Sequence, residues 1–427
     1  MKKAIAIQFT WVFVLIVGAM LFAFFMNVIG KQKDMAEQGS DVKTRDIIGN
    51  ILKIAEATPN TFNSHEIPNK PIVFDCTEPT SSSFSIGKKG SKGSLATNVV
   101  FMQEVMKSNK LYTWTLDWKI PYRAATFVYA TTPRTRYVFY KSDIDACASL
   151  MDWLLEDWPE EIEKTVVSGT PAEFMEEVVS KGYDSNVFVQ FGTDCRAVDY
   201  EDAANRINAM DSRLSDEDED GLRGGEEVHM ITIVPFVTDN NVVNKNHGEL
   251  FFYKRHAYPG EHGDSDLYYY RKEMLLGAIF APQKDLYECT MLKAFTRAQL
   301  VSELNYRRVY ALDDDTGTTG SHLSSRYWCD DLYGHIKYAF MNTTYPYCGN
   351  IKIIDDIILN LQSGTSLLDS ELLERNGEYC PTANSCQNAP GPYPCKENPF
   401  QRIDDNYNRL VRDARDISTV GNCPYVY

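Results

Sequence analysis

The segment Arg136-Tyr137-Val138-Phe139-Tyr140 opens the part of the chain whose pattern decides the fold. It is apolar almost throughout, which is typical of a strand that is buried on both faces of a sheet. Apolar side chains then recur at helical spacing over residues 147–154, and Thr165-Val166-Val167 follows as a second short strand. This order of strand, helix and strand predicts a βαβ unit.

The alternation of strands and helices continues to residue 253. Thr170-Pro171-Ala172-Glu173 is a capping box with proline at the first helical position, which predicts a helix that ends near Gly182. The pattern also predicts a helix at 202–210 and strands at 187–191, 228–237 and 250–253. Because βαβ crossovers are right-handed, the predicted fold class is α/β, with a Rossmann-like, mainly parallel and doubly wound sheet over residues 135–264.

The flanking regions differ from this core. Residues 58–134 are β-rich, with short strands expected at 71–74 and 111–115, and the Ser-, Gly- and Lys-rich tract 81–94 is expected to be a mobile loop. Residues 265–427 change to helical spacing and end in a cysteine-rich tail, so a helical, disulfide-rich C-terminal region is expected. Its predicted helices are 268–280, 286–312 and 351–361.

The composition excludes some classes of protein. A chain of 427 residues is long enough for two or three domains, and its 44% hydrophobic content is ordinary for a globular protein. The 59 acidic side chains outnumber the 43 basic ones, which gives a formal net charge of -16. Because phosphate binding needs a basic surface, no nucleic-acid partner is expected.

The chain begins with an apolar segment. Residues 9–29 (FTWVFVLIVGAMLFAFFMNVI) carry no charge, and about 21 helical residues span the roughly 30 Å of a bilayer core. The segment is longer than the apolar region of a cleaved signal peptide, so residues 1–30 are expected to form a transmembrane anchor. Lysines flank it on both sides, and the positive-inside rule therefore leaves its orientation open.

Residues 31–57 continue the helical pattern as an amphipathic stalk. A bend is expected at Gly39-Ser40, and the helix is expected to end at Thr58-Pro59-Asn60. The predicted apolar stripe consists of Val42, Ile47, Ile48, Ile51, Leu52 and Ile54.

An N-terminal helix that is apolar in its first half and amphipathic in its second resembles that of type IV pilin-like membrane-anchored surface proteins, particularly archaeal ones. The resemblance covers about the first 57 residues. Two features depart from it, because Lys3-Ala4 is a poor prepilin-peptidase site and the head is far larger than that of a usual major pilin. The remainder of the chain resembles uncharacterised archaeal anchored ectodomain proteins, which implies no function.

Ten cysteines are spread along the chain, and six of them lie in the last hundred or so residues, from Cys329 to Cys423. That region lacks the short ligand pairs, such as C-x2-C, that zinc sites use, so disulfides are favoured over zinc. Disulfides in turn favour an extracytoplasmic location for the head. The disulfide candidates are Cys76, Cys147, Cys195, Cys289, Cys329, Cys348, Cys380, Cys386, Cys395 and Cys423.

Small, hydroxylated and acidic residues follow three of the predicted strands. In an open α/β sheet, ligands bind beyond the carboxyl ends of the strands, where helix N-termini present backbone N–H groups. The same residue types are also the favoured helix N-caps, so ligand binding and capping both remain open. The candidate ligand-binding residues are Ser142, Asp143, Ser168, Gly169, Thr170, Gly192, Thr193 and Asp194.

An acidic loop matches the ligand spacing of a calcium site. Asp216, Asp218, Asp220 and Glu227 occupy positions 1, 3, 5 and 12 of an EF-hand-type loop, and Gly221 occupies position 6. An acidic solvated loop explains the same residues, so Ca²⁺ is a candidate cofactor only. A mixed histidine and carboxylate cluster at 256–266 fits an ordinary hairpin loop better than a metal site.

These observations predict a single-pass cell-membrane protein with a large extracytoplasmic C-terminal domain. We expect it to bind or assemble with other cell-surface or membrane proteins, or with its own copies, in a pilin-like or other surface complex. The alternative is an extracytoplasmic, hydrolase-like enzyme with its site at the strand ends. The sequence contains no phosphate-binding glycine motif and no nucleophile elbow, so the binding or assembly protein is preferred.

Overall fold

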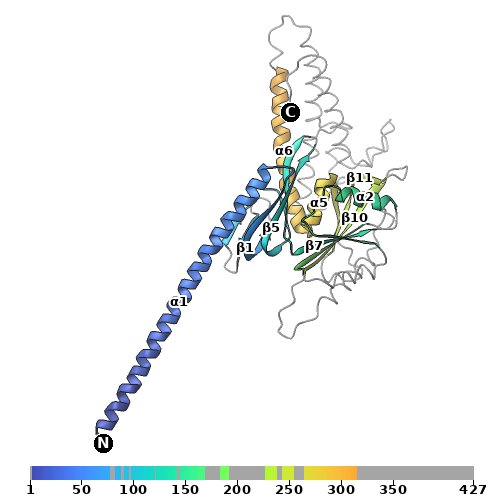
Figure 1. Cartoon of the computed structure of the whole chain (residues 1–427). Coiled ribbons are helices and arrows are strands. Elements are labelled where there is room, and N and C mark those ends of the chain that lie inside the picture. Colours follow the sequence, from blue (N-terminus) through green and yellow to red (C-terminus); the bar gives the residue numbers. More distant parts are fainter. Residues whose placement is uncertain are drawn as a thin grey trace, which may run out of the picture.

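The computed structural model of the chain describes residues 2–76, 82–87, 91–95, 98–120, 122–141, 145–168, 183–191, 227–237, 243–253 and 264–314. Over these residues it contains four helices and two six-stranded sheets (Figure 1). The protein is therefore a mixed α/β protein with a long N-terminal helix. The predicted helices at 170–182, 202–210 and 351–361 and the cysteine-rich tail lie outside the described residues.

Helix α1 (Lys2–Ala57) is continuous and projects from the head (Figure 1). The predicted bend at Gly39-Ser40 does not interrupt the helix: both residues lie within α1, and the Thr44 hydroxyl donates to the Ser40 carbonyl at 2.9 Å. The predicted end is confirmed: Thr58 N–H donates to the Ala55 carbonyl, and Asn60 has a positive φ of 55°. Asparagine tolerates this left-handed conformation, which turns the chain into the first strand.

The first sheet consists of β1 (Phe62–Asp75), β2 (Ser83–Ile86), β3 (Ser91–Ser94), β4 (Val100–Phe101), β5 (Val105–Lys119) and β6 (Arg123–Thr131). Its order is β3-β2-β1-β5-β6-β4, and every pairing is antiparallel except that of β4 with β6. The predicted β-rich character of this region is confirmed.

The expected mobile loop at 81–94 is wrong where the structure describes it, because β2 and β3 form a paired hairpin there. Phe84 and Ile86 are buried and alternate with Ser83 and Ser85, so β2 has the period of a strand with one buried face. The hairpin also contacts α1. Two apolar residues were enough to order a serine-rich segment because a helix covers them.

The second sheet consists of β7 (Thr135–Lys141), β8 (Lys164–Ser168), β9 (Ser185–Phe191), β10 (Glu227–Val237), β11 (Val243–Tyr253) and β12 (Asp264–Tyr270). Its order is β12-β11-β10-β9-β7-β8. The four strands from β8 to β10 in this order are parallel, as predicted.

Strands β11 and β12 correct two predictions. Strand β11 was expected in a parallel series but pairs antiparallel with β10, because only the short segment 238–242 joins them and a parallel crossover needs about a dozen residues or more. The helix expected from residue 268 begins at Arg271, since residues 267–270 pair with β11. The sheet is therefore mixed.

Three further helices complete the described structure: α2 (Asp145–Leu155), α5 (Arg271–Phe280) and α6 (Lys284–Asp314). Helix α5 contacts β6 of the first sheet and β11 and β12 of the second. The Phe280 ring lies 5.2 Å from that of Tyr129 in the first sheet and 5.1 Å from that of Tyr137 in the second. The two sheets thus share one hydrophobic core around α5.

Candidate functional site

The two halves of α1 have different surroundings. Large apolar side chains are exposed along the first half, for example Leu15 at 70% and Phe22 at 67%. In the second half, one face is buried against the first sheet, and it consists of Asp41, Thr44, Ile48, Leu52 and Ala55. Among the described residues, α1 is the one helix that is long and apolar enough to cross a membrane.

The predicted apolar stripe of the stalk is only partly buried. Ile48 and Leu52 are fully buried, whereas Val42, Ile47 and Ile54 are exposed at 41%, 46% and 62%. The buried face is rotated because polar groups complete it: Lys70 donates to the Asp41 carboxylate at 2.5 Å, and Thr44 bonds back to its own helix. An exposed apolar surface therefore continues along the side of the docked half.

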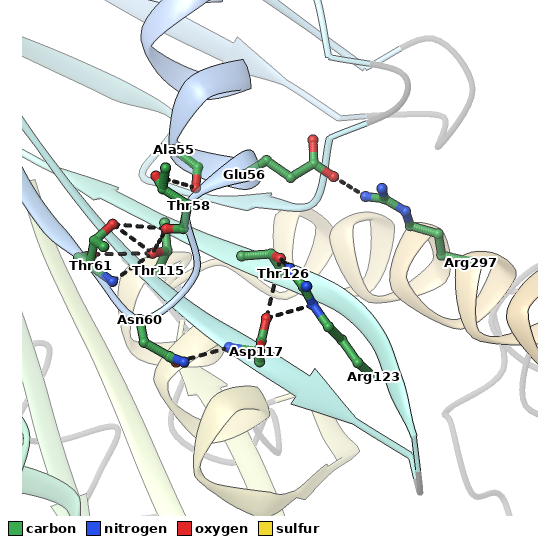
Figure 2. A network of polar contacts seen from close by, with 10 residues as sticks. All are labelled: Ala55, Glu56, Thr58, Asn60, Thr61, Thr115, Asp117, Arg123, Thr126 and Arg297. Atoms are coloured by element: carbon green, nitrogen blue, oxygen red, sulfur yellow. Dashed lines mark hydrogen bonds and ion pairs between the residues drawn. The ribbon is translucent and has the colours of Figure 1, made fainter. Parts of the chain in front are cut away.

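The end of α1 is tied to the first sheet by hydroxyl groups, in what we call the anchor junction (Figure 2). The Thr58 carbonyl accepts hydrogen bonds from the hydroxyls of Thr61 at 2.8 Å and Thr115 at 2.7 Å. Thr115 also accepts from the Thr61 N–H at 3.0 Å. Because Thr115 is fully buried in β5, these bonds fix the turn after α1 to the centre of the sheet.

A charged group extends the anchor junction toward the β5–β6 turn (Figure 2). The Asp117 carboxylate pairs with the Arg123 guanidinium at 2.8 Å, and the same guanidinium donates to the Thr126 hydroxyl at 2.8 Å. The Asn60 side chain accepts from the Asp117 N–H at 3.4 Å. Asn60, the left-handed residue in the turn after α1, is therefore held by β5, the strand that also contains Thr115.

Helix α6 contributes a second polar group at the end of α1. The Glu56 carboxylate pairs with the Arg297 guanidinium (Figure 2) and accepts a hydrogen bond from the Asn98 side-chain amide. One turn earlier on α6, the Lys293 ammonium is 7% exposed and donates to the Ser82 hydroxyl and to the carbonyls of Leu95 and Asn98.

Burial lowers the pKa of Lys293 to about 8, although the charge of Glu56 acts in the opposite direction. None of these four residues, Glu56, Asn98, Lys293 and Arg297, was predicted from the sequence as part of a site. The sequence does contain one sign of a buried polar contact, which is the lone lysine in the apolar run Met291-Leu292-Lys293-Ala294-Phe295.

Two of the ten candidate cysteines form a disulfide. Cys76, directly after β1, bonds to Cys289 in the second turn of α6, across 213 residues of sequence. A cavity of about 630 Å³ adjoins this bond, and its acidic lining includes Asp75, Glu104 and Asp285. The side chain of Cys147 and the other seven predicted cysteines lie outside the described residues.

The second sheet brings three of the predicted strand ends to one edge. Strands β8, β7 and β9 are neighbours and parallel, and Lys141 is in register with Ser168, the last residue of β8. The candidate residues Ser142, Asp143, Gly169, Thr170, Gly192, Thr193 and Asp194 lie outside the described residues. The alignment of the strand ends is thus present, and the side chains beyond them stay a prediction.

The calcium prediction is not tested. Glu227 is the first residue of β10, whereas Asp216, Asp218 and Asp220 lie outside the described residues. Within the described part of the chain, no group of three His, Cys, Asp or Glu side chains is placed to hold a metal ion.

Comparisons with protein-family models, with curated proteins and with solved structures found no match to this chain. A functional proposal therefore rests on the chain's own residues and geometry.

Proposed function

We propose that the protein is a single-pass membrane-anchored, extracytoplasmic binding or assembly protein, a component of a pilin-like or other cell-surface complex. The observation that carries the proposal is the contrast along α1: apolar side chains between residues 15 and 29 are exposed on several sides of the helix, whereas its second half is docked on the head. An apolar helix that projects from a folded head needs a lipid or protein environment.

One observation supports the extracytoplasmic location of the head. The Cys76–Cys289 disulfide joins two distant segments, and such structural disulfides persist in oxidising compartments. Protease added to intact cells should therefore digest the head, and a protected head would contradict this location.

The assembly face that we propose is the exposed apolar side of the docked half of α1. Ile47 and Ile54 are exposed on it, and half-buried Ile51 lies between them at helical spacing. A helix face of this kind is buried when a second amphipathic helix packs along it. The exposed helix from another copy supplies such a partner.

A paired substitution tests the assembly face. The double variant Ile47→Ser with Ile54→Ser should keep its fold but lose the multimers that mild-detergent extraction and chemical crosslinking detect for the wild type. Val105→Ser is the control, because Val105 is 38% exposed but is the first residue of β5 and not part of the proposed helix face. Wild-type protein that is only monomeric, or a double variant that assembles normally, would contradict the proposal.

A second candidate function is an extracytoplasmic, hydrolase-like enzyme. The observation that favours it is the strand order β8-β7-β9-β10. The chain adds β8 on one side of β7 and then β9 and β10 on the other, and ligands bind in open α/β sheets where the order of the strands changes side in this way. Hydrolysis of a panel of p-nitrophenyl esters, phosphates and glycosides should then fall at least about tenfold in Asp143→Asn or Asp194→Asn. No hydrolysis of any member of the panel by the wild type would count against this candidate.

A further inference from the structure

The disulfide between Cys76 and Cys289 lies in the wall of a cavity. The two residues are 3% and 7% exposed, and both line the cavity of about 630 Å³ beside them. The apolar part of the lining also includes Val73, Phe74, Leu286 and Leu292. The cavity is therefore the route by which a dissolved reagent reaches the two sulfur atoms.

The lining of this cavity carries charge of one sign. None of its residues is a lysine, an arginine or a histidine, and its carboxylates are those of Asp75, Glu104, Asp285 and Glu288. The two lysines of α6, Lys284 and Lys293, do not line it, and the Lys293 ammonium donates to Ser82 and to two main-chain carbonyls. A concave surface with charges of one sign concentrates ions of the opposite sign and repels ions of its own sign.

We propose that the cavity is a thiol–disulfide exchange site that selects thiols by their charge. Cationic thiols enter it and open the Cys76–Cys289 bond, whereas anionic thiols are repelled. In the first step the thiolate of the reagent attacks Sγ of Cys289, the more exposed of the two residues, and a bond forms between the two sulfur atoms. The protein S–S bond breaks, and Cys76 leaves as a thiolate that takes a proton from water.

A second molecule of the thiol completes the exchange. Its thiolate attacks the reagent sulfur of the mixed disulfide, and Cys289 leaves as a thiolate that is then protonated. Two thiols are oxidised to one small disulfide, and the protein disulfide is reduced by two electrons to two cysteine thiols. Asp75 directly precedes Cys76, and its negative charge disfavours the thiolate that leaves in the first step. Every reagent bears this cost equally, so differences among reagents report their access to the cavity.

The exchange changes the stability of the head. The disulfide joins the residue after β1 to α6 across 213 residues of sequence, and the loss of a crosslink over so long a loop lowers the thermal midpoint. Met291 and Phe295, on the next turns of α6, are fully buried, so packing keeps this helix in place after reduction. The exchange site therefore makes the stability of the head depend on the charge of the thiols around it.

The rates at which three small thiols reduce the full chain in mild detergent test the proposal. The thiols are cationic cysteamine, neutral mercaptoethanol and anionic mercaptoethanesulfonate, each at the same thiolate concentration. Each rate is divided by the rate of the same thiol with the neutral hydroxyethyl disulfide, which removes differences in intrinsic reactivity. Alkylation and peptide mass spectrometry follow Cys76 and Cys289 separately from the other cysteines.

The expected result is a series ordered by charge. At low ionic strength cysteamine should open the bond at least about tenfold faster than the sulfonate, with mercaptoethanol between them. At about 1 M ionic strength, where the screening length is roughly 3 Å, the ratio should fall below about twofold. Equal normalised rates for the three thiols at low salt, or no reduction of the folded protein by any of them, would overturn the proposal.

A matched pair of double variants tests the role of the carboxylates. Glu104→Gln with Asp285→Asn should lower the ratio of cysteamine to sulfonate rates at least about threefold at low salt. Glu160→Gln with Glu161→Gln is the control, because it removes the same charge from exposed residues that do not line the cavity, and it should keep the wild-type ratio. A wild-type ratio in the cavity variant would overturn the selection by these carboxylates. Circular dichroism checks the fold of each variant, and the salt dependence of the wild type decides the question if the cavity variant does not fold.

Discussion

The two halves of α1 are one helix with two different sources of stability. The docked half buries a narrow face on the first sheet, with Ile48 and Leu52 at its centre, while the apolar half exposes residues such as Phe22 and Phe25 in all directions. Packing in a soluble protein needs only one apolar stripe, whereas lipid surrounds a helix on every side. Over the described residues, the packed core therefore includes only the second half of α1.

The largest change in stability is expected from one of a pair of deletions. Removal of residues 2–33 should leave a soluble head with an unchanged thermal midpoint, because the described side chains from 15 to 33 bury little surface. Removal of residues 2–57 also takes away Ile48 and Leu52, a loss of about 3–6 kcal/mol from buried apolar area alone. That is a large share of the roughly 5–15 kcal/mol that stabilises a typical domain.

Thermal circular dichroism without detergent measures both deletions. The longer deletion should aggregate or unfold without a cooperative transition. A cooperative transition at the same temperature in both proteins would show that the docked half contributes nothing to the head, and the distinction between the two halves would fail.

Single substitutions distinguish the buried face of the docked half from its exposed face. Leu52→Ala should destabilise the protein by about 2–5 kcal/mol, because Leu52 is fully buried and its removal leaves a cavity. Ile54→Ala, two residues away and 62% exposed, should change the free energy of unfolding by less than about 0.5 kcal/mol. Equal losses in urea unfolding would mean that the buried face has been assigned wrongly.

Leu52 and Ile54 also show what could be predicted from the sequence. Helical spacing placed both in one apolar stripe, but six apolar residues made that stripe too wide to tell which edge faces the sheet. Which edge of the stripe faces the sheet depends on Asp41. Its carboxylate is buried because Lys70 of β1 pairs with it. A polar residue that is paired with a distant strand cannot be recognised as buried from local periodicity.

Local periodicity also predicted some of the strands but did not predict the polar contacts between distant segments. Strands β7 to β10 were predicted because each is a local apolar run, whereas the direction of β11 depends on the length of its connection. The group of Glu56, Asn98 and Lys293 was missed because its contacts join residues 42 and 195 positions apart. Such a group leaves no motif in the sequence, and only the fold brings it together.

An intermediate loss of stability is expected from a substitution in the anchor junction. Thr115→Val keeps the shape of the side chain but removes the hydroxyl that donates to the Thr58 carbonyl, which should cost about 1–3 kcal/mol. Thr296→Val is the matched control, because Thr296 is exposed and, among the described residues, its hydroxyl bonds to the Leu292 carbonyl of its own helix alone. If both variants lose the same stability in urea unfolding, the hydroxyl of Thr115 does not hold the end of α1.

The smallest expected effect concerns the ion pair between the end of α1 and α6. Arg297 is 40% exposed at its side chain and Glu56 is 15% exposed, so solvent screens much of their attraction. Arg297→Met, which keeps the apolar stem, should therefore cost about 0.5–1 kcal/mol at low salt. Arg45→Met should cost less than about 0.3 kcal/mol, because its partner Asp46 is its exposed neighbour on the same helix.

Salt distinguishes an ion pair from simple packing at this contact. At about 1 M ionic strength the screening length falls to roughly 3 Å, so most of the Arg297→Met deficit should disappear if charge attraction causes it. A deficit that persists unchanged in high salt would mean that the arginine stem, and not its charge, holds α6 against α1. The contact between α6 and the end of α1 would then depend on apolar packing and not on the attraction between Arg297 and Glu56.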